Sequence, residues 1–479
     1  MAEFQTNLAW DTLLELGEGR DGPLHARLSG ALRDAIRDGR LPAGSALPPS
    51  RTLAGDLGCS RWVVTETYAQ LAAEGYLDAR VGSGTRVRPL GQHEEAGRSP
   101  PAVAPARAPR IDLAPGLPDL RSFPLARWVA ALRSVTSTLA YAELGYPDPA
   151  GHPRLRQVLA GYLARVRGAQ ADPAQVTICR GVTDATHRVG QALRAAGIGA
   201  VAVEDPGWHR LRQAAVAAGL RVVPVPVDGQ GLRVGDLEDH PDVRAVIVSP
   251  THQFPTGVVL PAERRGALLA WARRVDGLIL EDDYDAEFRY DRRPVGTIQG
   301  TDPSRVALLG SLSKTLSPAL GIGWVATPPT WTGPFRATVG PPATPSTLDQ
   351  LSFAEFLQTG AYDRHLRAAR KRYRLRRDRL VSGLAERLPG ARLLGVAAGL
   401  HLLVLLDDPV DGAAVVSRAA TRDMRVANLD TYRVRDDTFG PGLVLGYGNL
   451  ADGQVEEAVA LLATTLAECR RRGAPASYA

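Results

Sequence analysis

The residues best suited to covalent chemistry surround Lys314, which follows an apolar run and stands between small hydroxyl residues in Ser311-Leu312-Ser313-Lys314-Thr315. Of the 57 lysines and arginines in the chain, only Lys314 and Lys371 are lysines. Arginine can meet general needs for positive charge, whereas only a lysine amine can lose its proton and form a Schiff base with a carbonyl compound. Lys314 is therefore a candidate for covalent chemistry, and an ordinary surface charge is the alternative.

Carboxylates gather at the end of a second apolar run, Leu278–Leu280, in the stretch Glu281-Asp282-Asp283-Tyr284. A buried Asp282 could keep a pyridine nitrogen protonated, and the Tyr284 hydroxyl could bond a phenolic oxygen beside an imine. An acid at the end of a strand can also be a helix cap or a solvated side chain. A Schiff-base lysine would give the acid and the tyrosine a chemical role.

Two further stretches could hold a planar ring and a phosphate. Trp208 is the last residue of the stretch Val203–Trp208, which leads from a predicted strand into a turn. Its indole could stack on a ring. A predicted helix begins after Arg180, so its first backbone N–H groups could bind a phosphate, and serines near Lys314 would add hydroxyl donors. These candidate donors are Gly181, Val182, Thr183, Ser311 and Ser313. Each could equally have a structural role.

The elements that must position these residues follow a regular pattern, because apolar runs alternate with helical stretches from Ile111 onward. This alternation predicts βαβ units and a mostly parallel sheet, with binding groups at the strand ends. The predicted strands are Val201–Glu204, Val222–Val227, Val243–Val248, Leu278–Asp282 and Val306–Leu309, with helices around 183–196, 207–218 and 261–274. A later α+β part has strands at Leu402–Leu406 and Leu443–Tyr447 and a last helix over 452–468.

The first 88 residues do not show this alternation of strands and helices. Their pattern predicts three helices over 24–39, 50–57 and 61–74 and two strands over 76–80 and 85–88. Gly-containing turns join the last two helices and the two strands. Three helices and a β-hairpin describe a winged helix-turn-helix, a DNA-binding fold. Residues 21–88 hold nine arginines and seven acids, so charge supports DNA binding only weakly. A small helical domain with surface arginines is the alternative.

Residues 89–110 are rich in proline and alanine and lack periodicity, which predicts a semi-extended linker. The three cysteines are widely spaced, no apolar run is long enough to span a membrane, and the first residues are no signal peptide. We therefore expect a cytoplasmic protein without a membrane partner. The net charge of +6 permits nucleic-acid binding. A basic helix over 366–378 could be a second DNA contact, a solvated face or a dimer contact.

The N-terminal motifs resemble those of the GntR family of bacterial regulators. They are Gly-Arg-Leu at 39–41, Pro-x-Gly at 42–44, Leu-Pro-x-x-Arg at 47–51, Leu-Gly-x-Ser-Arg at 57–61, Leu-x-x-Glu-Gly-Tyr-Leu at 71–77 and Gly-x-Gly-Thr at 82–85. The resemblance implies that Arg51 and Arg61 contact DNA and that the wing approaches the minor groove. The candidate DNA-binding residues are Arg51, Ser60, Arg61, Trp62, Thr65, Gly82, Ser83 and Gly84. Trp62 and Val63 stand where relatives often have Asn or Thr, so we expect a different operator.

Roughly residues 111–470 resemble the fold-type-I aminotransferases, which use pyridoxal phosphate (PLP). Behind a GntR-like head, the stretches SPTHQFPTG at 249–257, EDDYDAEF at 281–288 and YPDPAG at 146–151 make the chain similar to the MocR subgroup in particular. This resemblance implies an α/β fold-type-I domain with a mostly parallel sheet and a smaller C-terminal α+β part. The expected domains are a winged helix-turn-helix over 1–88, a linker over 89–110 and an aminotransferase-like PLP-binding effector domain over 111–479.

By the same resemblance, Lys314 forms the Schiff base with PLP, Asp282 meets the pyridine nitrogen and Tyr284 the ring oxygen. Trp208 takes the stacking position, where relatives usually have Tyr, and Arg210 matches an arginine that meets an effector carboxylate in some relatives. The phosphate would be held by Gly181, Val182, Thr183, Ser311 and Ser313. The resemblance also implies a head-to-tail homodimer, a double-stranded DNA operator and an amino-acid-like effector that forms an aldimine with PLP.

Three departures from the family pattern bear on the site. Gly321 replaces a phosphate-binding arginine whose charge-assisted contact would contribute about 1.5–3 kcal/mol, so we expect weaker PLP binding. Thr183-Asp184 replaces a Gln-Gln pair and brings an acid near the phosphate. Leu443–Tyr447 has no arginine where many aminotransferases bind the substrate carboxylate, and Arg433 is a candidate replacement.

The sequence thus favours a PLP-responsive transcription factor, in which ligand binding changes how paired winged helices meet two half-sites. An aminotransferase with a fused head is a second hypothesis, and the missing carboxylate arginine argues against it. A regulator that has lost tight PLP binding is a third, which Gly321 and Asp184 support.

Overall fold

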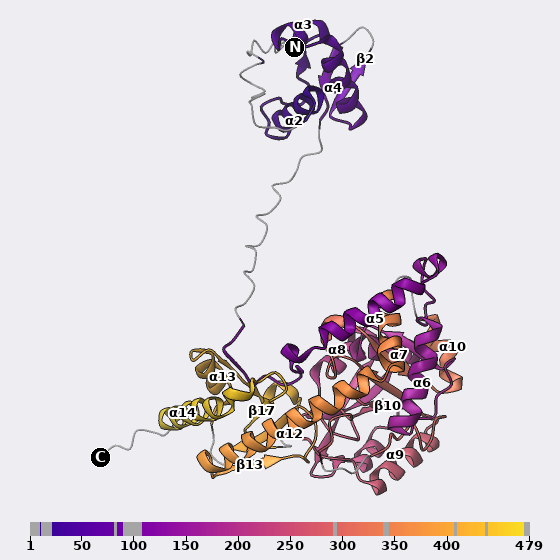
Figure 1. Ribbon diagram of the computed structural model, residues 1–479, viewed down its shortest axis with the longest axis vertical. Helices are drawn as coiled ribbons and strands as arrows, with labels where there is room; N and C mark the ends of the chain where they lie inside the picture. The colour runs from indigo at the N-terminus through magenta and orange to yellow at the C-terminus, as the bar shows by residue number, and fades with distance from the viewer. Residues whose placement is uncertain are drawn as a thin grey trace. The chain divides into compact units, whose positions relative to one another are not determined.

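The computed structural model describes Trp10 and residues 22–80, 84–89, 108–290, 295–338, 344–406, 410–435 and 439–473. The chain divides into two compact units, Met1–Arg107 and Ala108–Ala479 (Figure 1). Most of the predicted linker, and Gly82 and Ser83 of the predicted wing, lie outside the described residues.

The first unit has the three helices and the hairpin of a winged helix-turn-helix. Its helices are α2 (Leu24–Arg37), α3 (Ser50–Asp56) and α4 (Arg61–Ala73), and its strands are β1 (Ala46–Leu47), β2 (Leu77–Arg80) and β3 (Gly84–Val87). The apolar stripe of α2, with Leu28 and Leu32, packs against Val64 of α4. Strand β3 pairs antiparallel with β2 and also with β1, a two-residue strand too short to be recognised from the sequence.

The second unit is built on an eight-stranded sheet with the order β5-β12-β11-β10-β9-β6-β7-β8. The strands are β5 (Val176–Cys179), β6 (Ala200–Asp205), β7 (Arg221–Asp228), β8 (Gly231–Leu232), β9 (Ala245–Val248), β10 (Leu278–Asp282), β11 (Val306–Ser311) and β12 (Gly323–Ala326). All of these except β8 and β12 run parallel to one another, so the expected mostly parallel sheet is confirmed.

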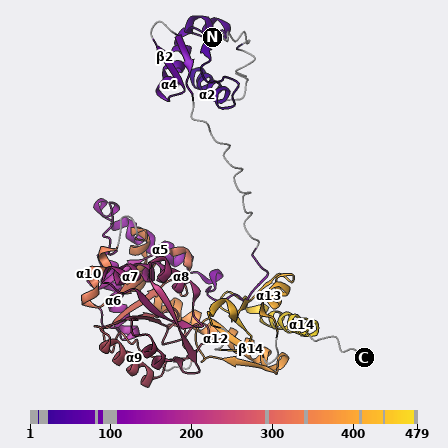
Figure 2. The ribbon, with the colours of Figure 1, turned by 180° about the vertical axis from the view of Figure 1, so that it is seen from behind.

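Helices cover both faces of this sheet, as Figure 1 and Figure 2 show. One face packs against α7 (Val182–Ala195), α8 (His209–Ala217) and α10 (Pro329–Ala337) through apolar side chains such as Val189 and Leu211. The other face packs against α9 (Ala262–Arg274) through Leu268 and Trp271. Strands that are covered on both faces are apolar throughout, which explains why they appear in the sequence as continuous apolar runs. The remaining helices of this part are α5 (Leu125–Thr138), α6 (Pro153–Arg167) and α11 (Thr347–Gln358).

The C-terminal part holds a four-stranded antiparallel sheet in the order β13-β14-β17-β16. Its strands are β13 (Ala391–Leu394), β14 (His401–Leu406), β16 (Ala427–Asn428) and β17 (Gly442–Gly446), with helices α12 (Ala361–Arg387), α13 (Gly412–Ala420) and α14 (Val455–Gly473). A separate pair joins β4 (Ile111–Asp112) to β15 (Met424–Arg425). Short 3-10 turns lie at Leu120–Ser122, Tyr141–Leu144, Val234–Asp239, Pro318–Leu320, Leu429–Tyr432 and Asp452–Gln454.

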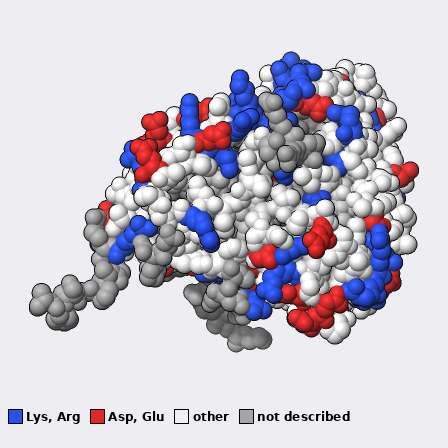
Figure 3. Space-filling view, turned by 90° about the horizontal axis from the view of Figure 1, so that it is seen from below, with Lys and Arg blue, Asp and Glu red and all other residues white. Residues whose placement is uncertain are grey.

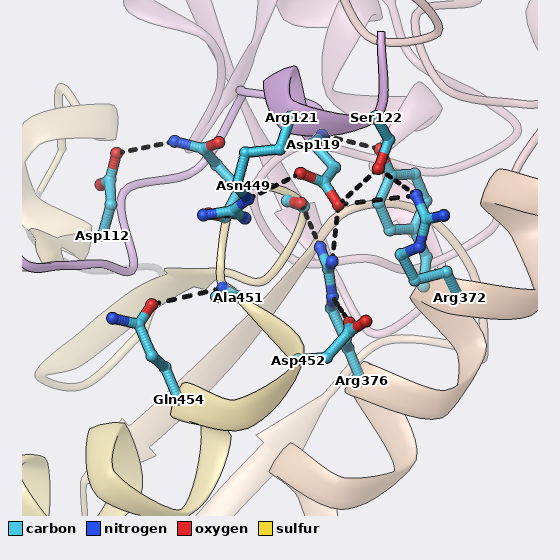
Figure 4. A network of polar contacts seen from close by, with 12 residues as sticks. Asp112, Asp119, Arg121, Ser122, Arg372, Arg376, Asn449, Ala451, Asp452 and Gln454 are labelled. Carbon is cyan, nitrogen blue, oxygen red and sulfur yellow. Dashed lines mark hydrogen bonds and ion pairs between the residues drawn. The ribbon is translucent and has the colours of Figure 1, made fainter. Parts of the chain in front are cut away.

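The basic helix predicted over 366–378 is the middle of α12. Its Arg376 is buried and pairs with the buried carboxylate of Asp119 at 2.6 Å, so this arginine supports the fold (Figure 4). Elsewhere arginines pair with acids near the surface, as Arg264 does with Asp228 at 2.7 Å. On the face shown in Figure 3, basic and acidic side chains are interspersed. Within the described ranges, no helix is both long and apolar enough to cross a membrane.

Candidate functional site

A cavity of about 350 Å³ lies at the edge of the sheet where parallel strands end. The first residues after β5, β6, β10 and β11 contribute to it, because the carboxyl ends of parallel strands share one edge. The predicted cofactor residues that line this cavity are Gly181, Val182, Thr183, Trp208, Asp282, Tyr284, Ser311, Ser313 and Lys314, and Arg210 lines it as well. The fold therefore brings together residues from four separate stretches of the sequence.

Lys314 lies on the loop after β11 and approaches two other stretches. Its Nζ donates a 2.6 Å hydrogen bond to the backbone oxygen of Gly116 and lies 5.5 Å from the centre of the Trp208 ring. Burial lowers the pKa of the Lys314 amine below its ordinary value, although Asp282 and Asp285 act in the opposite direction. A lowered pKa increases the fraction of neutral, nucleophilic amine, as Schiff-base chemistry requires.

Asp282 ends β10, where it pairs in register with Leu309 of β11. Burial raises the pKa of the Asp282 carboxyl to about 7, and Asp283 adds to this rise while Lys314 opposes it. In the part of the chain that the structure describes, no group hydrogen-bonds the buried Asp282 Oδ1. A buried carboxylate oxygen without a donor is costly, so it is suited to a ligand that brings an N–H group. The pyridine nitrogen of PLP, when protonated, fits this requirement.

Tyr284 is positioned by His252 and Asp285, for which the sequence analysis predicted no role. Its hydroxyl lies 3.1 Å from His252 Nδ1, which is in turn 2.9 Å from Asp285 Oδ2. Burial raises the pKa of Tyr284 well above its ordinary value, and Asp285 and Asp282 add to the effect, so the hydroxyl keeps its proton. His252 and Asp285 stand inside the two stretches quoted for the MocR resemblance, and that position was the signal available for finding them.

His401 begins β14 and also lines the cavity. Burial, together with His252, lowers the pKa of His401 well below its ordinary value, so its imidazole is neutral. Among the described residues, none hydrogen-bonds the buried His401 Nε2. Its ring centre lies 5.0 Å from that of His252 and 4.9 Å from that of Phe254, contacts between distant stretches that no local pattern signals.

Trp208 forms an aromatic wall of the cavity. Its indole stacks on Tyr432, with ring centres 5.9 Å apart and an 18° angle between the planes, and meets Phe254 edge to face. Gly116 lies so close that a Cβ there would be 3.8 Å from the Trp208 ring and 3.1 Å from Lys314 Nζ. Trp208 is therefore packed against neighbouring aromatic rings, and it suits a planar ring lying beside the lysine.

The start of α7 forms another part of the cavity lining. Gly181 has a φ of 111°, a conformation that favours glycine, and precedes the first helical residue. Asp184, which the sequence placed near the phosphate, accepts hydrogen bonds from the backbone N of Arg180 at 2.9 Å and from Arg188 Nε at 2.8 Å. Its charge is therefore balanced by Arg188. Gly321 has a φ of 57° and does not belong to the cavity lining.

The two predicted effector-binding arginines differ in position. Arg210 lies in the first turn of α8 and lines the cavity. Arg433 is not part of the lining, and its guanidinium donates to Phe439 O at 2.6 Å and pairs with Asp430. The Leu443–Tyr447 stretch forms the buried strand β17 and the residue after it.

The predicted DNA-binding residues cluster at the start of α4 and on the neighbouring α3. Ser60 caps α4 by accepting from Val63 N, and Arg61 Nε donates to Ser50 Oγ at 3.3 Å. Trp62 is 63% exposed. The exposed side chains on these helices are Arg51, Arg61, Trp62 and Thr65, and Gly84 starts β3 with a φ of 80°. The second helix of a helix-turn-helix presents such a face to the major groove.

Comparisons with known proteins assign both units. Residues 24–87 match the gntR family of bacterial regulatory proteins, and residues 109–428 match aminotransferase class I and II. The chain is 36% identical over 392 residues to the probable rhizopine catabolism regulatory protein MocR of Rhizobium meliloti, covering 77% of this chain and 79% of that protein. It is 33% identical over 434 residues to the pyridoxine biosynthesis regulator PdxR of Corynebacterium glutamicum, covering 88% and 91%. Among solved structures, the multiple substrate aminotransferase of Thermococcus profundus matches with a TM-score of 0.69 and 26% identity, covering 77% of this chain and 93% of that one.

Proposed function

This chain belongs to the MocR subgroup of the GntR family, helix-turn-helix transcriptional regulators with an aminotransferase-like domain, and from that premise we propose that PLP bound at Lys314 controls its binding to DNA. The observation that carries the proposal is the cavity, because Lys314 with its lowered pKa lies in the same lining as the unpaired buried Asp282 Oδ1. A PLP-dependent fold with these residues retained supports a working cofactor site.

In the proposed division of labour, residues 1–88 bind DNA, 89–110 link the domains and 111–479 form the PLP-binding effector domain. Within the first domain, contacts to DNA are proposed for the exposed face of α3 and α4 and for the wing. The residues concerned are Arg51, Ser60, Arg61, Trp62, Thr65, Gly82, Ser83 and Gly84.

When bound, PLP supplies an aldehyde that condenses with a primary amine and a ring that withdraws electrons. Lys314 would provide the amine, Asp282 would accept a hydrogen bond from the ring nitrogen, and Tyr284 would donate to the ring oxygen. Trp208 would lie against the ring. The phosphate would meet the α7 end, at Gly181, Val182, Thr183, Ser311 and Ser313.

Two candidate signals follow from this arrangement. One relative is named for the regulation of pyridoxine biosynthesis, which supports PLP itself as a signal. An amino compound with a carboxylate is the other candidate, because Arg210 offers a bidentate partner for a carboxylate inside the cavity. Arg433 would have to leave Phe439 and Asp430 to take part, so Arg210 is the better supported of the two.

We also propose a homodimer with head-to-tail arrangement. Large apolar side chains before α6 are exposed in the single chain: Tyr141 is 93%, Leu144 59% and Tyr146 99% exposed. Apolar surface of this kind is typical of a protein interface. The half-sites of an operator would then be read by paired winged helices.

An aminotransferase is the second candidate function. It is favoured by the lowered pKa of Lys314, which suits a general base, and by the likeness to aminotransferase structures. The absence of an arginine in Leu443–Tyr447 weighs against it. Turnover of amino donors with 2-oxoacids well above the rate of free PLP would support this function.

The test uses the full chain and a Lys314→Arg variant, which keeps the positive charge but cannot form a Schiff base. DNA that the protein binds is first selected from a random pool. We expect the wild type to gain a visible absorbance band on adding PLP and to change its affinity for the selected DNA. The variant should bind the same DNA without either response. A wild type that shows no band, or a variant that responds like it, would refute the proposal.

A further inference from the structure

Arg180 brings a positive charge to the part of the cavity where a phosphate would lie. Arg180 lines the cavity directly before Gly181 and the start of α7, and its side chain is exposed. The other cations in the lining are Lys314, which lies beside Trp208, and Arg210, which lies on α8 after Trp208. Arg180 is thus the lining cation that belongs to the α7 end.

Strand register brings Arg180 close to the serines of the Lys314 loop. Gly323 of β12 pairs with Cys179 on one side and with Ser311 on the other, so Cys179 and Ser311 lie two strands apart, roughly 10 Å. Both flanking strands end at the same edge, and Arg180 is the next residue after Cys179. A phosphate placed between the start of α7 and Ser311 would therefore be within reach of an arginine side chain.

The same register relates Arg180 to Gly321. Because Gly323 pairs with Cys179 and these strands are antiparallel, Arg180 falls opposite Ile322, next to Gly321. The two loops are in close contact, since a Cβ on Gly323 would come within 2.5 Å of Gly181 Cα. An arginine at 180 can thus bring positive charge to the neighbourhood where residue 321 has no side chain.

The start of α7 also favours an anion. The carboxylate of Asp184 is bound by the Arg188 side chain and by the backbone N–H of Arg180. The helix dipole and the backbone N–H groups at the start of α7 favour an anion there. A phosphate monoester is the anion that these groups suit.

Building on the proposed PLP site, we propose that Arg180 binds the phosphate of PLP and supplies the charge-assisted contact that Gly321 cannot make. An arginine guanidinium binds two phosphate oxygens at once, which accounts for a large share of affinity in such sites. Arg180 is then a binding residue, and the β5–α7 turn, not the loop before β12, holds the phosphate.

The test compares PLP with pyridoxal, which has the same ring and aldehyde but no phosphate. Affinities are measured by absorbance titration of the full chain and of Arg180→Gln and Arg180→Lys. The matched control is Arg194→Gln, which removes an exposed arginine near the other end of α7. We expect Arg180→Gln to weaken PLP binding roughly ten- to hundredfold with little change for pyridoxal, Arg180→Lys to lose less, and the control to match the wild type.

The outcomes distinguish a failure of the Arg180 proposal from a failure of the proposed PLP site. If Arg180→Gln leaves PLP affinity unchanged, or weakens PLP and pyridoxal equally, Arg180 is not the phosphate-binding residue, while the PLP site itself stands. If the wild type binds neither compound, the PLP site fails and the role of Arg180 fails with it. A selective loss of PLP affinity in Arg180→Gln alone supports both.

Discussion

Lys314 Nζ donates its hydrogen bond to the backbone oxygen of Gly116, at 2.6 Å. Gly116 belongs to the stretch Pro115–Leu117, which lines the cavity and lies a few residues after the boundary between the two units. On one side this stretch is anchored by Asp112, which accepts from Arg425 Nε at 2.9 Å. A reaction that uses the Lys314 nitrogen must break or redirect the bond to Gly116. We infer that the state of the lysine is coupled to the first residues of the second unit.

Gly116→Ala is expected to weaken PLP binding. Gly116 has a φ of 98°, which an alanine rarely adopts, and the added Cβ would lie 3.1 Å from Lys314 Nζ. Strain in this conformation costs about 1–2 kcal/mol, and the lysine must also shift. PLP affinity from absorbance titration should fall at least tenfold. Gly266→Ala is the control, because its Cβ meets nothing within 4 Å on α9. Equal affinities of the two variants would contradict the expectation.

The chemistry of the cavity could be predicted because its residues follow apolar runs. The run Leu278–Asp282 forms β10, and a parallel sheet must place its end beside the end of β11. Strand β12 escaped prediction because it is only four residues long and begins with a glycine. The contacts of His252 and His401 could not be predicted from periodicity. His252 meets Tyr284 and His401 meets Phe254, each from a distant stretch, and local periodicity carries no information about such contacts.

The basic helix also shows that a local sequence pattern does not reveal contacts with distant stretches. Arginines at 366–378 suggested a DNA contact, a solvated face or a dimer contact, since charge in a sequence does not reveal burial. In the fold, Arg376 crosses to Asp119, more than 250 residues earlier in the chain, and also donates to Asp452 at 2.5 Å. Figure 4 shows Asp119 between Arg121, Arg372 and Arg376.

Arg376→Met is expected to destabilise the second unit by about 3–5 kcal/mol. Asp119 and Arg376 are each 3% exposed, and removal of the arginine leaves a buried carboxylate without its main partner. Urea unfolding followed by circular dichroism measures the loss. Arg374→Met is the matched control on α12, because Arg374 and Asp378 are 3.8 Å apart and 54% exposed, a pair expected to contribute less than about 0.5 kcal/mol. Similar losses in both variants would show that the buried pair is not stabilising.

Asp282→Asn should stabilise the PLP-free protein at high pH but not at low pH. The folded pKa of about 7 lies above the ordinary value of 3.8, so the folded state binds more protons between these values. Stability is therefore lost as the pH rises through this window, and the cost is complete above it. Complete removal of this effect would correspond to roughly 4 kcal/mol.

The measurement is urea unfolding of wild type and Asp282→Asn at about pH 5 and pH 8 without PLP. The variant should gain stability relative to the wild type only at the higher pH. With PLP present the order should reverse at pH 8, because asparagine cannot balance a protonated ring nitrogen. A difference between the proteins that is the same at both pH values would rule out titration of Asp282 as its cause.

Trp62→Ala is expected to change which DNA the protein selects, whereas Arg61→Ala should weaken binding to all sequences. Trp62 is 63% exposed at the start of α4, and its ring centre lies 5.7 Å from that of His25, so its indole is available to base edges and thymine methyl groups. Arg61 lies beside it and is suited to a phosphate.

Affinity for the selected DNA, measured at several salt concentrations, separates the two roles. Arg61→Ala should reduce the slope of log affinity against log salt by about 1, and Trp62→Ala should leave the slope unchanged while specific affinity falls. If Trp62→Ala selects the same DNA as the wild type with the same affinity, the exposed indole is not part of the reading surface.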